Sequence, residues 1–171
     1  MIDWVTLPEL TTTLNEITVR RATLADASQI FSLVNLGERE GQLLPRTLES
    51  IRASICDWIV AVDGVRLVGA SALVEMHSAL AEVRSLVVAP DYRKFGVGAQ
   101  IVHALIDLAR ERNIATVFAL TRAVLFFEKQ GFIISDKENF PEKVWHDCSI
   151  CRLQFACDEV AMVMSVPTKN E

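Results

Sequence analysis

The stretch LVVAPDYRKFGVGA, residues 86–99, decides the fold, because it joins a strand to a long helix through a turn with two glycines. Its β-branched residues end a strand predicted over residues 81–88, and Pro90 cannot continue that strand. A helix is predicted over residues 96–112, where apolar side chains recur at helical spacing. These apolar side chains belong to Val97, Ile101, Leu105 and Leu108.

The turn itself has the chemistry of an anion site. Gly96 and Gly98 lack a Cβ atom, so an anion can approach the main chain closely, and the unpaired N–H groups that begin a helix favour negative charge. Arg93 and Lys94 add direct positive charge. The turn ends without the Gly-Lys-Ser/Thr of a nucleotide triphosphatase, and Ile101 stands where a dinucleotide fingerprint needs glycine. A tight turn without any ligand is the alternative interpretation.

The rest of the chain alternates between strand-like and helix-like patterns. We expect Thr23 or Asp26 to cap the first helix, Gly37 and Gly41 to end it, and Asp63-Gly64 to form a hairpin turn. The predicted order is a mixed α/β sheet with helices packed against it, in one domain over residues 17–171 after an arm or tail over residues 1–16. Further strands are expected at 17–22, 58–62, 65–76, 114–120 and 160–166, and further helices at 47–55 and 122–130.

Composition narrows the functional classes. The chain has 171 residues, 51% of them apolar, which suits one domain with a sizeable core. Its net charge of −5 argues against a nucleic-acid partner. The apolar stretch 114–127 contains Arg122 and is shorter than a membrane span, and the first residues lack the basic region of a signal peptide. We therefore expect a cytoplasmic protein with reduced cysteines and no membrane partner.

A second block, AVLFFEKQGF at residues 123–132, supports a family assignment. Residues 86–98 together with this block resemble the acetyl-CoA signature of the GNAT superfamily of acyl-CoA N-acyltransferases. The resemblance spans roughly residues 17 to 166. It implies a mixed, mostly antiparallel central sheet (an α+β arrangement) flanked by helices. It also implies direct acetyl transfer from acetyl-CoA to an amine.

The resemblance implies roles for individual residues. The amides of residues 95–99 would hold the CoA pyrophosphate, the backbone of residues 86–88 would pair with the pantetheine arm, and the N–H of Val88 would polarise the thioester. Many members carry a tyrosine where this chain has Phe127, which has no proton to donate. The thiolate would then leave unaided or take a proton from water or from the ammonium, and a non-catalytic CoA-binding regulatory module stays open. The expected cofactor-binding residues are Leu86, Val87, Val88, Arg93, Lys94, Phe95, Gly96, Val97, Gly98, Ala99 and Phe127.

Four further segments, at 41–46, 81–86, 120–121 and 140–145, resemble small stand-alone N-acetylglutamate synthases. This likeness implies L-glutamate as the acceptor and a role in arginine biosynthesis. Arginine recognises carboxylates at two points, so Arg46 and Arg84 are candidate substrate-binding residues with Thr121, and Lys143 is a weaker one. Each arginine could instead be a surface charge or a structural ion pair, and another amine could be the acceptor. The family also suggests a homodimer.

Glu82 is the candidate general base, either directly or through water, and a carboxylate paired with a neighbouring arginine is the alternative. His77 and His103 are poorer candidates, and we expect His103 to be exposed to solvent. Cys56 lies in the largely apolar stretch 55–60, which favours core packing over nucleophilic chemistry.

A cysteine cluster near the end of the chain raises the question of a metal. His146, Cys148, Cys151 and Cys157 could coordinate a structural zinc ion, but a full zinc module usually shows a second close pair, which is missing here. Three reduced thiols near a hairpin are favoured, and a redox-sensitive pair is a further alternative. We therefore predict no metal site.

Overall fold

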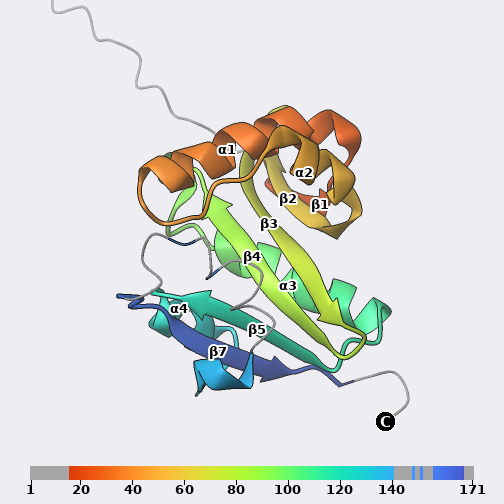
Figure 1. Ribbon diagram of the computed structural model, residues 1–171. Helices are drawn as coiled ribbons and strands as arrows, with labels where there is room; N and C mark the ends of the chain where they lie inside the picture. Colours follow the sequence, from red (N-terminus) through yellow and green to blue (C-terminus); the bar gives the residue numbers. More distant parts are fainter. Residues whose placement is uncertain (1–15, 141–147, 149–150, 152–155, 168–171) are drawn as a thin grey trace, which may run out of the picture.

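A computed structural model describes residues 16–140, 148, 151 and 156–167 (Figure 1). In this part of the chain, seven strands form one sheet in the order β1-β2-β3-β4-β5-β7-β6. All neighbouring strands are antiparallel except β4 and β5, which are parallel. The strands are β1 (Thr18–Arg21), β2 (Trp58–Asp63), β3 (Arg66–His77), β4 (Leu80–Val88), β5 (Thr116–Thr121), β6 (Ile133–Ser135) and β7 (Val160–Ser165).

Helices cover both sides of the sheet (Figure 1). On one side lie α1 (Ala27–Arg39) and α2 (Leu48–Ala53); on the other lie α3 (Val97–Glu111) and the short α4 (Val124–Lys129). The predicted fold class, a mixed and mostly antiparallel sheet flanked by helices, is confirmed. None of the helices in the described ranges is long and apolar enough to cross a membrane.

Helix α3 is the central support of the sheet. Its buried side chains follow the predicted helical spacing and include Val97, Ile101, Leu105 and Leu108. The helix approaches β3 so closely that a Cβ atom at Gly69 would lie 2.7 Å from the Ile101 side chain. Because real Cβ atoms do not come this near, Gly69 sets the distance between helix and sheet.

Two predicted breaks differ from the structure. Helix α1 continues through Gly37 to Arg39. This glycine serves close packing rather than helix termination, because it is buried and a Cβ there would lie 2.7 Å from Leu43. Gly41, with φ of +70°, follows the helix end as expected. The hairpin turn falls one residue later than predicted, at Gly64 and Val65, because Asp63 still pairs with Arg66 in the ladder.

Other predicted boundaries shift by one to three residues. Thr47 lies just outside α2 as its N-cap, and its hydroxyl accepts from the Ser50 amide at 3.1 Å. Strand β5 begins at Thr116 rather than at Ile114, because the Ile114 amide donates back to Ala109 at 2.9 Å at the end of α3.

Candidate active site

Strands β4 and β5 pair only at their beginnings. Three pairs join them, from Leu80 with Thr116 to Glu82 with Phe118. Beyond these pairs the two strands diverge, and Figure 1 shows the resulting V between β4 and the β5–α4 segment. Two parallel strands that separate leave the facing edge of each strand without a ladder partner, so main-chain groups are presented to the gap.

A β-bulge interrupts β4 before its last residues. Ala72 pairs with Arg84 and Ala70 with Val87, so two residues of β4, Ser85 and Leu86, lie opposite one residue of β3. Ser85 has φ of +56°, the left-handed region that serine rarely adopts. The sequence gives no signal for this bulge, because neither glycine nor an Asn-Gly pair marks it.

The bulge changes which side of the sheet each later side chain faces. Val87 faces α1, since a Cβ on Gly37 would lie 3.4 Å from it, and Val88 faces α3, since a Cβ on Gly98 would lie 3.7 Å from it. Arg84 shares the face of Val87, because their partners Ala72 and Ala70 lie two residues apart on β3. Beside the gap, β4 thus presents different residues to the two faces of the sheet.

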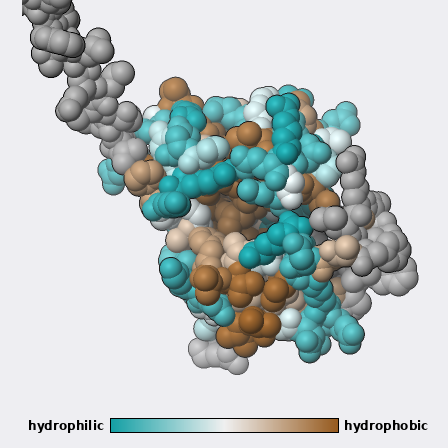
Figure 2. Space-filling view, turned by 90° about the vertical axis from the view of Figure 1, so that its left-hand side faces the viewer, coloured by the Kyte–Doolittle hydropathy of each residue, from teal (hydrophilic) through white to brown (hydrophobic). Residues whose placement is uncertain are grey.

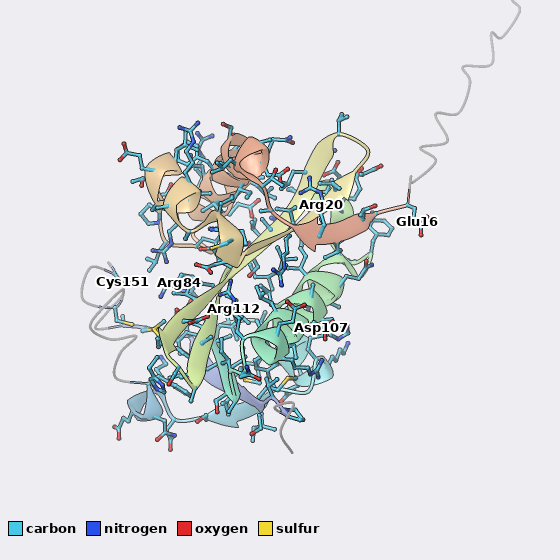
Figure 3. All side chains as sticks on the ribbon, turned by 90° about the vertical axis from the view of Figure 1, so that its right-hand side faces the viewer. Glu16, Arg20, Arg84, Asp107, Arg112 and Cys151 are labelled. Carbon is cyan, nitrogen blue, oxygen red and sulfur yellow. The ribbon has the colours of Figure 1, made fainter. Side chains whose placement is uncertain are left out.

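Glu82 and Arg84 form an ion pair on the side of α1 and α2. The Arg84 Nε and a terminal nitrogen donate to Glu82 Oε2 at 2.9 and 2.7 Å, and the Glu82 side chain is only 3% exposed. In Figure 3 the strands lie between the Arg84 and Asp107 labels, with α3 on the Asp107 side. The alternative interpretation of Glu82, a carboxylate bonded to a neighbouring arginine, is therefore the geometry observed.

The main chain of Val88 points toward the gap. The Ala89 amide donates to Val68 of β3 at 2.8 Å. Successive N–H groups of an extended chain alternate in direction, so the Val88 N–H faces the opposite edge, where β5 has diverged. The Val88 carbonyl, on that same edge, accepts from Arg93 Nε at 3.0 Å.

The turn after β4 has the geometry expected of an anion site. Lys94 and Gly96 have φ of +72° and +79°, and α3 begins at Val97. The first main-chain bond of the helix runs from the Gln100 amide to the Gly96 carbonyl at 3.1 Å. The amides from Gly96 to Ala99 therefore precede the helical ladder, as in every helix start.

Three elements meet at the inner end of the gap. A Cβ on Gly98 of α3 would lie 3.4 Å from the ring of Phe126 on α4, and Val88 of β4 approaches from the third side. Sequence reasoning missed Phe126, because it singled out its neighbour Phe127. Phe127 is instead 4% exposed, and its ring packs edge-on against the rings of Phe126 and Phe132.

Arg93, which was predicted to add positive charge for an anion, has two partners within the protein. Besides its bond to Val88, it donates to Glu40 just after α1 at 2.6 Å. Arg93 therefore connects the end of β4 to the start of the α1–α2 loop. Lys94 and Phe95 are exposed beside it, the latter with 57% of its surface.

Of the remaining predicted acceptor residues, the structure describes Arg46 and Thr121. Arg46 comes from the α1–α2 loop and is half-buried. The Thr121 hydroxyl accepts from the Ala123 amide at 2.9 Å, which fixes the turn from β5 into α4. Lys143 lies outside the described residues. Figure 2, which looks onto the left-hand side of Figure 1, shows a hollow with hydrophobic residues between hydrophilic rims on this face.

One ion pair and a tyrosine anchor the glycine turn to the β2–β3 hairpin. The Tyr92 hydroxyl donates to Asp63 at 2.5 Å, and this bond raises the pKa of Tyr92. Arg66 lies over the Tyr92 ring, 5.2 Å from its centre, and binds Asp91 at 2.6 and 3.1 Å. The Arg66 guanidinium holds the pKa of Asp91 below its usual range. The hairpin thus restrains the turn from which α3 starts.

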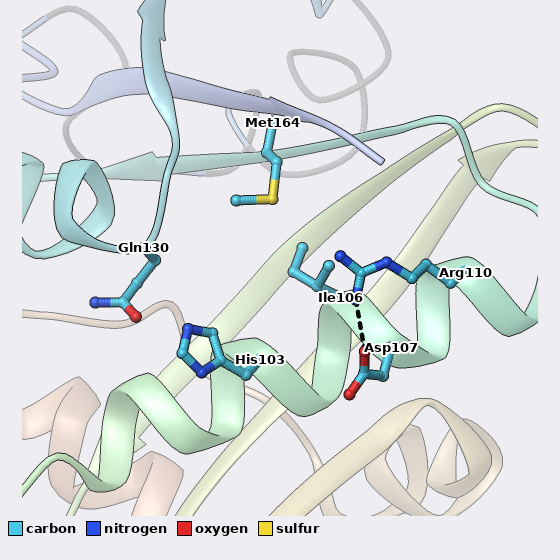
Figure 4. Close-up of a pocket in the computed structure, with 6 residues that line it drawn as sticks. All are labelled: His103, Ile106, Asp107, Arg110, Gln130 and Met164. Carbon is cyan, nitrogen blue, oxygen red and sulfur yellow. Dashed lines mark hydrogen bonds and ion pairs between the residues drawn. The ribbon is translucent and has the colours of Figure 1, made fainter. Parts of the chain in front are cut away.

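A separate pocket of about 380 Å³ lies between α3 and β7 (Figure 4). His103 lines it and is exposed, as predicted, and Gln130 and Met164 face it from the other side. The charge of Arg110 in this pocket is met by Asp107 of the same helix at 2.6 Å. His77 is exposed and accepts from the Ala79 amide at 3.3 Å.

The cysteines differ in part from expectation. Cys56 is exposed rather than packed in the core, because it lies in the 3-10 turn Ile55–Asp57 that leads into β2. Cys157 accepts from the Lys137 ammonium at 3.3 Å. His146 lies outside the described residues, and within them no three His, Cys, Asp or Glu side chains are grouped to hold a metal ion.

The fold class is the predicted mixed sheet flanked by helices. Its sheet opens between two parallel strands, beside a helix that begins at a left-handed glycine. The chain matches the model of the acetyltransferase (GNAT) family over residues 24–132. An uncharacterized N-acetyltransferase of Chlorobaculum tepidum is 38% identical over 148 residues, which cover 86% of this chain and 96% of that protein. This chain therefore belongs to the acetyltransferase (GNAT) family.

More distant relatives carry names that describe an activity. An amino-acid acetyltransferase of Shewanella oneidensis is 32% identical over 127 residues, 73% of this chain but only 28% of that protein. A Mycobacterium tuberculosis protein in complex with CoA and NLQ has a TM-score of 0.74 at 26% identity, covering 88% of this chain and 99% of its own. N-acetylglutamate synthase of Neisseria gonorrhoeae, complexed with CoA and N-acetyl-glutamate, has a TM-score of 0.78 at 24% identity. It shares the fold, over 88% of this chain and 35% of that one.

Proposed function

We propose that this protein transfers the acetyl group of acetyl-CoA directly to the α-amine of L-glutamate. The observation that carries the proposal is the gap beside β4, where the Val88 N–H faces the opening and Glu82 and Arg84 lie on the side of α1 and α2. One strand thereby offers groups suited to the thioester and, on its other side, groups suited to an amino acid. The amino-acid acetyltransferases among the relatives support this acceptor class.

The thioester side uses main-chain groups. The amides of residues 95–99 would hold the CoA pyrophosphate at the positive end of α3. Leu86, Val87 and Val88 would pair with the pantetheine arm as if it were an added strand. Gly98 lies close to both walls, because a Cβ atom there would come 3.7 Å from Val88 of β4 and 3.4 Å from the Phe126 ring.

The chemical step needs a base and an oxyanion donor. Glu82 accepts a proton from the acceptor ammonium, directly or through water, and the freed amine attacks the thioester carbon. The Val88 N–H stabilises the oxyanion as the C–N bond forms, and the C–S bond then breaks. Phe127 offers no proton, so the thiolate leaves as the anion or takes a proton from water or from the nitrogen, which loses its second proton as the amide forms.

Acceptor recognition falls to cationic side chains. Arg84, beside the gap, and Arg46, in the α1–α2 loop, suit the two carboxylates of glutamate, and Thr121 marks the β5 side. Such an enzyme would serve arginine biosynthesis in the cytoplasm. A non-catalytic CoA-binding module is the second candidate, and the observation that favours it is the buried Phe127 without a hydroxyl.

The test follows CoA release from acetyl-CoA with each amino acid in turn. Turnover with glutamate above all others supports the proposal. CoA binding without turnover on any amine would contradict the proposal and favour the non-catalytic CoA-binding module. Turnover on a different amine would show that glutamate is not the acceptor.

Arg46→Ala tests the acceptor side. We expect it to raise the glutamate KM about tenfold or more, because a charge-assisted bond contributes roughly 1.5–3 kcal/mol, and to leave the acetyl-CoA KM unchanged. Arg52→Ala, which removes an exposed arginine of α2, is the matched control. Equal effects on both KM values would remove Arg46 from the acceptor site.

A further inference from the structure

Ser71 lies directly opposite the bulge of β4. It is fully buried, at 0% exposure, in the middle of β3. Its hydroxyl donates to the main-chain oxygen of Arg84 at 2.9 Å. This bond fixes the peptide that immediately precedes Ser85, the residue with a left-handed φ of +56°. A buried hydroxyl thus supports the one strained position of the strand.

The bulge is required for the two-sided site. In a regular strand, Arg84 and Val88 are four residues apart and would face the same side of the sheet. The extra residue reverses this alternation, so Arg84 faces α1 and Val88 faces α3. The same reversal sets the edge toward which the Val88 N–H points.

We propose that Ser71 is a positioning residue, whose hydroxyl holds the bulge in the form that aims the Val88 N–H into the gap. This inference rests on the proposed function, and it adds a residue that touches neither substrate. The Ser71 hydroxyl offsets the cost of a left-handed serine, roughly 1–3 kcal/mol, and so keeps one arrangement of the last β4 residues dominant.

The experiment compares Ser71→Ala with Ser71→Cys and with a control, Ser54→Ala. Ser54 also donates to a main-chain oxygen, that of Ser50 at 2.9 Å, and accepts from Trp58, but it lies at the end of α2. We expect Ser71→Ala to lower kcat by about 10–100-fold, because small misplacements of reacting groups have effects of this size. Both KM values should stay within about threefold, and Ser71→Cys, with a weaker donor, should lie between wild type and Ser71→Ala.

A second readout separates this inference from the acceptor assignment. Amide hydrogen exchange of residues 85–88, measured without substrates, should quicken in Ser71→Ala at least tenfold more than in Ser54→Ala. If glutamate is not acetylated, the proposed function fails and the exchange still tests Ser71. If the exchange of residues 85–88 and kcat change no more in Ser71→Ala than in Ser54→Ala, Ser71 is an ordinary core residue and the inference is wrong.

Discussion

Glu82 is a buried carboxylate whose partner is the neighbouring Arg84, at 2.7 Å. A base in this setting is held in one orientation, and removing its charge while keeping its size isolates the chemical role from packing. We predict that Glu82→Gln lowers kcat by roughly 10²–10⁴-fold, the range that general-base catalysis contributes.

Glu75→Gln is the control for this residue. Glu75 lies on the adjacent strand, β3, and also pairs with an arginine, Arg112 at 3.1 Å, but it is exposed. Its loss should leave kcat unchanged. A kcat for Glu82→Gln within threefold of wild type would make Glu82 a structural partner of Arg84, and the base would have to be sought elsewhere.

The start of α3 depends on a left-handed Gly96, with φ of +79° and no atom within 4 Å of an added Cβ. Gly96→Ala therefore meets backbone strain and no clash, and we predict a loss of about 1–2 kcal/mol of stability. The amides beside it should turn away from the pyrophosphate, so the acetyl-CoA KM should rise severalfold in steady-state kinetics.

Gly41→Ala provides the matched variant, because Gly41 has φ of +70° and equally open surroundings after α1. It should lose similar stability while keeping the acetyl-CoA KM. If the two variants change that KM alike, the start of α3 does not hold the pyrophosphate.

The junction of β1 and α1 is held by Asp26, which binds Arg20 at 2.7 and 2.9 Å and the Thr23 amide at 2.7 Å. The bonds from Arg20, above all, lower the pKa of Asp26 from 3.8 to about 2. Because the folded pKa is depressed, this stabilisation is present above pH 3.8 and is lost as pH falls toward 2. We predict that Asp26→Asn lowers the free energy of unfolding by about 2 kcal/mol near neutral pH. In chemical denaturation, the free energy of unfolding of this variant should fall less steeply as the pH is lowered from 3.8 toward 2.

Asp107→Asn is the comparison, since Asp107 pairs with Arg110 on the exposed face of α3. Exposed pairs contribute roughly 0–1 kcal/mol. Equal losses in the two variants at neutral pH, or an unchanged acid limb in Asp26→Asn, would contradict the role of Asp26.

The elements differ in how far the sequence predicts them. Helix α3 follows from its periodic apolar residues, and the tight turn before it follows from Gly96. Gly37 lies inside helix α1 instead of ending it, because glycine is needed there for the close approach of Leu43, which no local pattern reveals. The bulge at Ser85 likewise depends on a partner strand, through the Ser71 bond, so sequence reasoning found the residues around the gap but not what shapes it.

At the scale of the whole molecule, the sheet consists of two parts, β1 to β4 and β5 to β7, that share only three residue pairs. Helix α3 packs on the first part and reaches α4 of the second at Gly98 and Phe126. A ligand seated in the gap would contact both parts at once. Binding should therefore stabilise the molecule as a unit, beyond the loop that grips the ligand.

We therefore predict that CoA alone raises the thermal stability of the protein substantially. At 100 times its Kd, a ligand adds about 2.7 kcal/mol of stability, which for a chain of this size corresponds to a Tm increase of roughly 5–10 °C. Thermal denaturation measures the shift, and amide exchange should slow in both parts, at residues 86–88 and at 124–129. Slower exchange near Gly96 alone would show that CoA is held by its pyrophosphate without entering the gap. The absence of any Tm shift would overturn the assignment of the gap, because a ligand that binds only the folded state must stabilise it.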